Sequence, residues 1–188
     1  MKKLVLTLFT LCFFSISFSQ IKTPQPSPSC SIKQTVGITE ISVNYSRPGA
    51  KDRAIFGELV PYNKIWRTGA NKATAITFDS DVIFGETKVK KGTYSLFTVP
   101  GENDWIVMLN KETELWGEGN YNKENEVASF KVKSKKTAYF TESFTIDFNT
   151  FFGFGAMMNL TWENTQVSIP VMTLGKEKLA EQFKKELV

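Results

Sequence analysis

The feature that most constrains the fold is an alternation of apolar and polar residues, which recurs along most of the chain with a period of two. In the segment ITEISVNY, the apolar side chains of Ile41, Val43 and Tyr45 fall on one face. Since successive side chains of a β-strand point to opposite faces, this pattern is typical of half-buried strands. Turn residues such as Gly85 and Glu86 separate the short runs, which favours a meander of antiparallel strands.

The runs continue towards the end of the chain, and we count roughly nine or ten of them, at the spacing typical of sandwiches and jelly rolls. The last part of the domain divides into four runs, VASFKVKS, AYFTESFTIDF, AMMNLTWE and TQVSIPV. The chain is therefore predicted to be all-β, an antiparallel β-sandwich of jelly-roll-like form at residues 31–173. No repeat or linker divides it, so we expect one domain.

Two other segments flank this predicted domain. Before it, residues 20–30 are rich in proline and should form an extended N-terminal lead. After it, residues 174–188 place Leu179, Phe183 and Leu187 at helical spacing. We therefore expect one C-terminal α-helix, either packed on the sandwich or frayed.

The first 19 residues have the pattern of a signal peptide. Lys2 and Lys3 precede an apolar run, and small residues follow at Ser17 and Ser19, as signal peptidase requires. The run is shorter than the roughly 20 residues that span a bilayer, and no second candidate follows it. We therefore expect residues 1–19 to be cleaved and the mature protein to be secreted, either periplasmic or extracellular, with no membrane span.

The chain contains no histidine, which excludes several kinds of site. Ser-His-Asp and Cys-His catalysis and histidine-built zinc sites all require that side chain. Neither a phosphate-binding glycine motif nor a calcium loop occurs, so we expect no cofactor and no metal. Removing the two leader lysines lowers the net charge from +4 to +2, which does not favour nucleic acid as a partner. Cys30 would be the one cysteine left, so no internal disulfide is expected.

A group of acidic residues offers a catalytic alternative. Glu112, Glu114 and Glu118 surround Trp116, and two carboxylates near an aromatic ring are typical of glycosidases. The same residues could equally form a solvated loop, because the sequence does not give the distance between the carboxyl groups.

The segment from Arg47 to Asn71 reads as neither strand nor helix, and ordered loops of this length are usually functional. It is also basic, since residues 47–72 contain six basic and two acidic side chains. Arginine binds carboxylates and phosphates through two donors at once, tryptophan stacks on rings, and asparagine both donates and accepts hydrogen bonds. The alternative is a structural clamp, in which the arginines tie the loop to backbone carbonyls or to Glu58. The candidate ligand-binding residues are Arg47, Lys51, Arg53, Tyr62, Trp66, Arg67 and Asn71.

The same segment carries a resemblance to a known family. The stretch YSRPGAKDRAIFGELVPYNKIWRTGANKATAITF, together with KKGTYSLFTVPGENDWIVMLN and TWENTQVSIPV, resembles the exported bacterial family catalogued as domain of unknown function 2911 (DUF2911). The resemblance covers about residues 29–171. It implies an exported, β-rich domain and brings no activity, substrate or catalytic residue with it. Asn63 departs from the family pattern, which has glycine after VPY, and this concerns only the local turn.

The residues thus lead to a prediction of an exported, non-catalytic binding module for a small anionic or carbohydrate ligand. Two alternatives remain open. One is a histidine-free hydrolase or isomerase that uses a carboxylate with lysine or tyrosine. The other is a structural envelope protein in which Phe151, Phe152 and Phe154 contact a protein partner.

Overall fold

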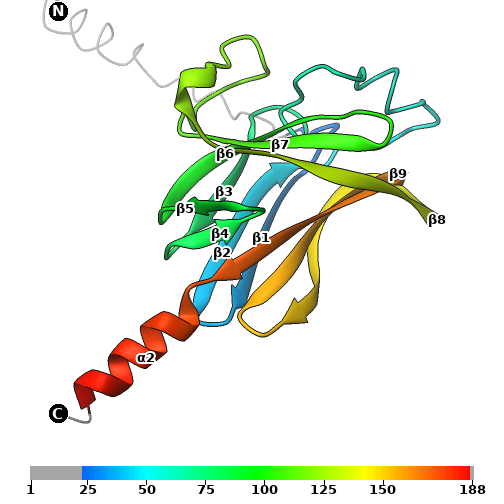
Figure 1. Ribbon diagram of the computed structural model, residues 1–188. Helices are drawn as coiled ribbons and strands as arrows, with labels where there is room; N and C mark the ends of the chain where they lie inside the picture. Colours follow the sequence, from blue (N-terminus) through cyan, green and yellow to red (C-terminus); the bar gives the residue numbers. More distant parts are fainter. Residues whose placement is uncertain (1–22, 187–188) are drawn as a thin grey trace, which may run out of the picture.

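The computed structural model describes residues 23–186, without the side chains of residues 176–178, 181 and 182. Within these residues the chain is all-β with one C-terminal helix, as predicted (Figure 1). The predicted signal peptide and the first residues of the lead, 20–22, lie outside the described residues. The elements are β1 (Ser29–Val36), β2 (Thr39–Ser46), β3 (Thr74–Phe78), β4 (Val82–Phe84), β5 (Thr87–Val89), β6 (Gly92–Val99), β7 (Asp104–Asn110), the 3-10 turn η1 (Lys123–Asn125), β8 (Glu126–Phe152), β9 (Gly155–Thr173) and α2 (Gly175–Glu186).

The nine strands of the described residues form a single antiparallel sheet, in the order β1-β2-β3-β6-β7-β8-β9-β4-β5. Strand β8 belongs to two parts of it, since residues 126–133 pair with β7 and residues from 134 onwards pair with β9. Side chains from both parts contribute to one hydrophobic core, so the sheet folds over onto itself. The antiparallel all-β prediction is confirmed. The finer jelly-roll-like sandwich is not, because the strands are joined in one sheet.

The four runs expected in the last part of the domain are two long strands. Strand β8 has 27 residues and β9 has 19. They pair with register shifts between Lys136 and Thr141, between Thr141 and Thr145, and between Phe148 and Thr150. Such shifts are β-bulges or wider irregularities of the pairing, and they bend a strand without ending it. The lysine-rich stretch that looks like a turn in the sequence is therefore a bend within a continuous strand.

The core follows the period-two pattern. In β2, Ile41, Val43 and Tyr45 are buried, and the residues between them are more exposed. The β4–β5 hairpin closes the core, because the ring of Phe84 lies 5.8 Å from that of Phe78 in β3. Burial of these apolar surfaces is the main stabilising contribution in a chain whose described residues contain no disulfide.

Both ends of the domain differ in detail from the prediction. Strand β1 begins at Ser29, so Ser29 and Cys30 of the expected lead belong to the sheet. Helix α2 forms, yet it extends away from the sheet, and Phe183 on its expected apolar face is 61% exposed (Figure 1). The helix is therefore not held against the sheet by Phe183. Among the described residues no helix is both long and apolar enough to cross a membrane.

The phenylalanine-rich turn lies at the β8–β9 hairpin. Phe151 and Phe152 are 53% and 41% exposed. Phe154 instead lies against Gly37 and Gly175, where a Cβ atom would come within 3.0 Å and 2.7 Å of its ring. Two of the three rings are thus accessible, and contact with a protein partner through them stays a prediction.

Candidate functional site

The segment 47–71 runs irregularly between β2 and β3 and is anchored in the core. Ile55, Val60 and Trp66 are each at most 6% exposed. The backbone of Trp66 also pairs with Thr98 of β6, with N–H to O distances of 2.7 and 2.9 Å in the two directions. The segment is therefore an integral part of the folded domain.

Trp66 lies at the centre of an aromatic cluster. Its ring centroid is 5.9 Å from that of Trp162, with the planes 20° apart, and 5.1 Å from that of Phe144. Phe56 approaches it edge-on at 6.0 Å. Pairs in these geometries stabilise a fold beyond their burial alone. Since Trp66 is only 6% exposed, a ligand could reach only a small part of its ring, and stacking on it stays a prediction.

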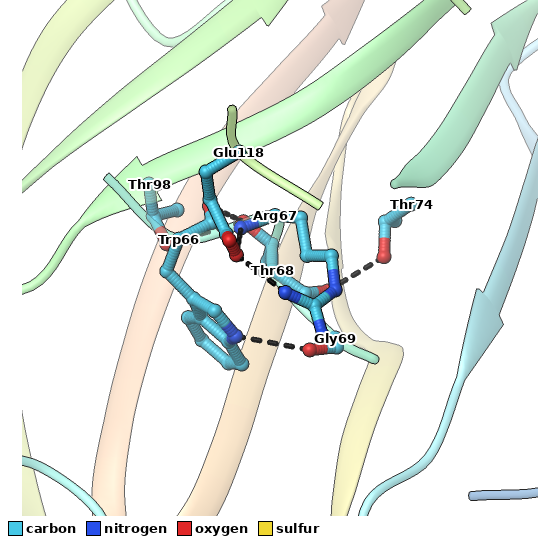
Figure 2. A network of polar contacts seen from close by, with 7 residues as sticks. All are labelled: Trp66, Arg67, Thr68, Gly69, Thr74, Thr98 and Glu118. Carbon is cyan, nitrogen blue, oxygen red and sulfur yellow. Dashed lines mark hydrogen bonds and ion pairs between the residues drawn. The ribbon is translucent and has the colours of Figure 1, made fainter. Parts of the chain in front are cut away.

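The turn after Trp66 is held by its own hydrogen bonds (Figure 2). The indole Nε1 of Trp66 donates to the carbonyl of Gly69 at 2.9 Å. The hydroxyl of Thr74 donates to the carbonyl of Thr68 at 2.6 Å. These bonds fix the backbone that follows Arg67 and so help to fix the direction in which its side chain leaves the turn.

Two positions in this turn require unusual backbone geometry. Thr68 is fully buried with a φ of 53°, and its hydroxyl lies 3.1 Å from that of Thr98. A Cβ atom at Gly69 would lie 3.1 Å from the carbonyl oxygen of Ser46, so glycine permits the close approach of these two backbones. A left-handed non-glycine residue costs about 1–3 kcal/mol and often marks a functional site.

A cavity of about 350 Å³ opens beside the turn. Small-molecule sites have volumes of roughly 300–1,000 Å³, so a small organic ligand would fit. With two cations and one anion in its wall, the cavity has a formal charge of +1. Its charged lining residues are Arg53, Arg67 and Glu118. Its apolar lining residues include Leu59, Ile65, Trp66 and Trp162.

Arg67 and Glu118 form an ion pair in this wall (Figure 2). Nη1 of Arg67 lies 2.6 Å from Oε1 of Glu118, and the same oxygen accepts the backbone N–H of Arg67 at 3.3 Å. The two side chains are 27% and 34% exposed, so the pair is only partly shielded from water. Nε of Arg67 is buried without a hydrogen-bond partner, and Nη2 has none among the described residues. Arg67 thus keeps donor capacity beyond its pairing with Glu118.

Arg53 is held in place by its own loop. Its Nε donates to the carbonyl of Ala50 at 3.0 Å, and its Nη2 donates to the carbonyl of Gly49 at 2.8 Å. No acidic side chain lies within ion-pair distance of it in the described part of the chain. A guanidinium oriented by carbonyls keeps its full charge at the cavity.

Arg47 and Asn71 do not line the cavity and instead tie the segment to its surroundings. Arg47 donates from Nε to the carbonyl of Phe144 at 3.0 Å and from Nη2 to the hydroxyl of Thr145 at 2.7 Å. The amide of Asn71 donates to the Ser46 hydroxyl at 3.2 Å. For these two residues the structural-clamp alternative is the better description.

Lys51 and Tyr62 also lie away from the cavity. Lys51 is exposed with a φ of 51°, and its backbone N–H donates to the carboxylate of Glu142 at 2.9 Å. The ring of Tyr62 covers Gly57, where an added Cβ would come within 2.9 Å of it. Of the seven candidates, the structure therefore brings Arg53, Trp66 and Arg67 to one cavity.

Sequence reasoning missed most residues that line this cavity, among them Glu118, Leu59 and Ile65. Glu118 was considered only as part of an acidic cluster, and it is 51 residues from Arg67 in the chain. Leu59 and Ile65 are 45% and 37% exposed. The one signal for Leu59 and Ile65 was that they are apolar residues within a basic, irregular segment. The same pattern is equally typical of core residues.

The acidic residues around Trp116 do not act together, because two of them pair with different basic side chains. Glu114 pairs with Lys72 at 2.8 Å, and Glu118 pairs with Arg67. Glu112 accepts the backbone N–H of Glu114 at 3.2 Å. Among residues 23–186 no group of three or more cysteine, aspartate or glutamate side chains is placed to hold a metal ion.

The chain was compared with known proteins. A family model described as "Protein of unknown function (DUF2911)" matches residues 27–171. No curated protein and no solved structure matches the chain. The matched range includes the whole of segment 47–71 and Glu118, and it ends before α2.

Proposed function

Since the chain belongs to the family described as protein of unknown function DUF2911, which assigns no activity, we propose its function from its own cavity. The protein is an exported, non-catalytic binding module for a small anionic carbohydrate. The observation that carries this proposal is the pair of guanidinium groups, Arg53 and Arg67, on the wall of one cavity with Glu118 as the single acid of that wall.

The charge of the cavity favours a singly charged anion. Arg53 is unpaired by any described acid, and Arg67 retains free donors after its bond to Glu118. A bound carboxylate would accept from both guanidinium groups in charge-assisted hydrogen bonds, which are stronger than neutral ones. The backbone carbonyls that hold Arg53 reduce the side-chain entropy lost on binding.

The remaining wall favours a sugar as the carrier of that carboxylate. Oε2 of Glu118 has no hydrogen-bond partner among the described residues and can accept a hydrogen bond from a hydroxyl group of the ligand. Leu59 and Ile65 offer partly exposed apolar surface for the C–H face of a ring. A uronic acid has a negative charge, hydroxyl groups and the C–H face of a ring, whereas acetate or phosphate has only the charge.

Two observations support binding rather than hydrolysis. Glycosidases use two carboxyl groups about 5–9.5 Å apart across the bond that is broken. Glu118 is the one acid among the described residues of the cavity wall, where its carboxylate is engaged by Arg67, and Glu58 lines only the hollow beside it. The chain also has no histidine to act as a general base.

The experiment is a thermal-shift and calorimetric comparison of the chain from residue 20 onwards with glucuronate, glucose and acetate. A ligand that binds only the native state raises its stability by mass action. Glucuronate should raise the melting temperature, and glucose and acetate should do so less. Arg67→Ala should weaken glucuronate binding about tenfold or more, the value expected for loss of a hydrogen bond to a charged group.

Lys64→Ala is the matched control. Lys64 is an exposed cation of the same segment that does not line the cavity, so this variant removes the same charge. Its affinity for glucuronate should equal that of the wild type. Equal losses in both variants would mean that only the overall charge matters, and no shift with any of the three ligands would refute the proposal.

A further inference from the structure

A second, more open hollow adjoins the cavity. It is lined by Arg53, Ala54, Glu58 and Leu59. Two of these residues, Arg53 and Leu59, also line the cavity beside Arg67. The two hollows therefore meet along the Arg53 and Leu59 side chains, and a ligand longer than one unit could occupy both.

We propose that this second hollow is a subsite for a neutral sugar unit attached to the anionic sugar in the cavity. The inference rests on the proposed function and names its ligand class: an acidic oligosaccharide in which a uronic acid is followed by an uncharged hexose. The chain thus binds such a disaccharide more tightly than a free monosaccharide.

The side chains of the second hollow are suited to a neutral unit. Glu58 has no ion-pair partner within 4.0 Å among the described residues, so no cation contacts its carboxylate directly. It can accept hydrogen bonds from sugar hydroxyls, but it repels a second carboxylate. Leu59, which is 45% exposed, offers apolar surface to the rings of both units at their junction.

The position of Arg53 sets the order of the two units. Its Nε and Nη2 are used by the carbonyls of Ala50 and Gly49, so the guanidinium cannot swing freely between the hollows. Arg67 adds a second positive charge to the wall of the cavity. Glu58 adds a negative charge to the wall of the outer hollow. The carboxylate therefore belongs in the cavity and the neutral unit in the hollow.

The test compares three ligands by calorimetry: glucuronate, an aldobiuronic acid (a uronic acid linked to a neutral hexose) and a diuronic acid. The wild type should bind the aldobiuronic acid more tightly than glucuronate and should gain nothing from the diuronic acid. Glu58→Gln should improve binding of the diuronic acid about fourfold, the factor that one like-charge contact at ~5 Å in water represents. It should leave glucuronate binding unchanged.

Ala54→Trp provides a second variant, because Ala54 is exposed and lines only the outer hollow. It should abolish the gain from the neutral hexose and leave glucuronate affinity as in the wild type. If glucuronate binds but the aldobiuronic acid binds no more tightly, or if Glu58→Gln does not change the preference, the subsite is refuted and the proposed function stands. If glucuronate itself does not bind, the proposed function fails first.

Discussion

Nη1 of Arg67 lies 2.6 Å from Oε1 of Glu118, although the two residues come from loops 51 positions apart in the chain. The same carboxylate oxygen accepts the backbone N–H of Arg67, so Glu118 fixes both the side chain and the turn that carries it. The pair is partly exposed, and such pairs contribute little to stability, about 0–1 kcal/mol. Its main effect is to hold a guanidinium at the wall of a cavity.

Glu118→Gln removes the negative charge of this pair while the side chain keeps nearly the same shape. The amide keeps one hydrogen-bond acceptor for Arg67 and removes the negative charge, so the formal charge of the cavity rises from +1 to +2. Glucuronate should bind about two- to tenfold more tightly, and the gain should shrink as salt is added. Calorimetry at two salt concentrations measures this. Weaker binding at low salt would show that loss of the acceptor at Oε2 outweighs the gain in positive charge.

Trp66→Ala should destabilise the fold strongly. The side chain is 6% exposed and packs on Trp162, Phe144 and Phe56. Removal of a buried tryptophan costs about 3–5 kcal/mol of the free energy of unfolding. Urea denaturation measures the loss, and Trp116→Ala is the control, because that residue is 75% exposed and should cost less than about 0.5 kcal/mol. Similar losses at the two positions would contradict the described core.

Stability should fall in alkali because of Tyr45. Burial raises the pKa of this phenol to about 12, partly opposed by the N–H of Ile146, and nearby Cys30 adds to the rise. In the unfolded chain the pKa is near 10, so the folded state holds the proton more tightly. The stability from this group is present below pH 10 and is lost as the pH rises through 12, about 2–3 kcal/mol in all.

Denaturation curves of wild type and Tyr45→Phe between pH 9 and pH 12 check this. Phenylalanine leaves the N–H of Ile146 without its acceptor, so the variant should be less stable at neutral pH. Its stability should nevertheless fall less steeply above pH 10. Burial raises the pKa of Tyr121 as well, and that contribution should remain in both proteins. Parallel curves would refute the assignment to Tyr45.

Removal of residues 176–188 should leave the fold almost unchanged. Phe183 is exposed and α2 extends away from the sheet (Figure 1). We expect the melting temperature to stay within about 2 °C of the wild type, as for changes away from the core. A longer deletion from residue 174 removes Gly175, which is buried against Phe154, and should cost more. A large loss with the shorter deletion would show that α2 packs on the domain.

The fold was predictable from the sequence as far as local patterns extend. Alternation in β2 identified Ile41, Val43 and Tyr45 as core residues, and helical spacing identified α2. The long strands β8 and β9 were divided wrongly into four, because a bulge and a turn use the same polar and lysine-rich residues. Only the pairing of the residues with a neighbouring strand distinguishes a bulge from a turn.

The site was predictable only in part, for a similar reason. The composition of segment 47–71 pointed to Arg53 and Arg67, and it pointed equally to Arg47. Arg47 is taken up by a carbonyl and a hydroxyl of β8, and Glu118 comes from a distant loop. Which charged groups meet in one cavity depends on the folding of the sheet, and no local sequence pattern encodes that.

The most direct test of the central claim is an NMR titration of the chain from residue 20 onwards with glucuronate, observing backbone amides and the indole N–H groups. The cavity predicts saturable shifts concentrated at Arg67, Gly69, Ala70 and Glu118, together with the indole of Trp66. Shifts confined to residues outside the cavity wall, or no shifts at millimolar ligand, would contradict the account.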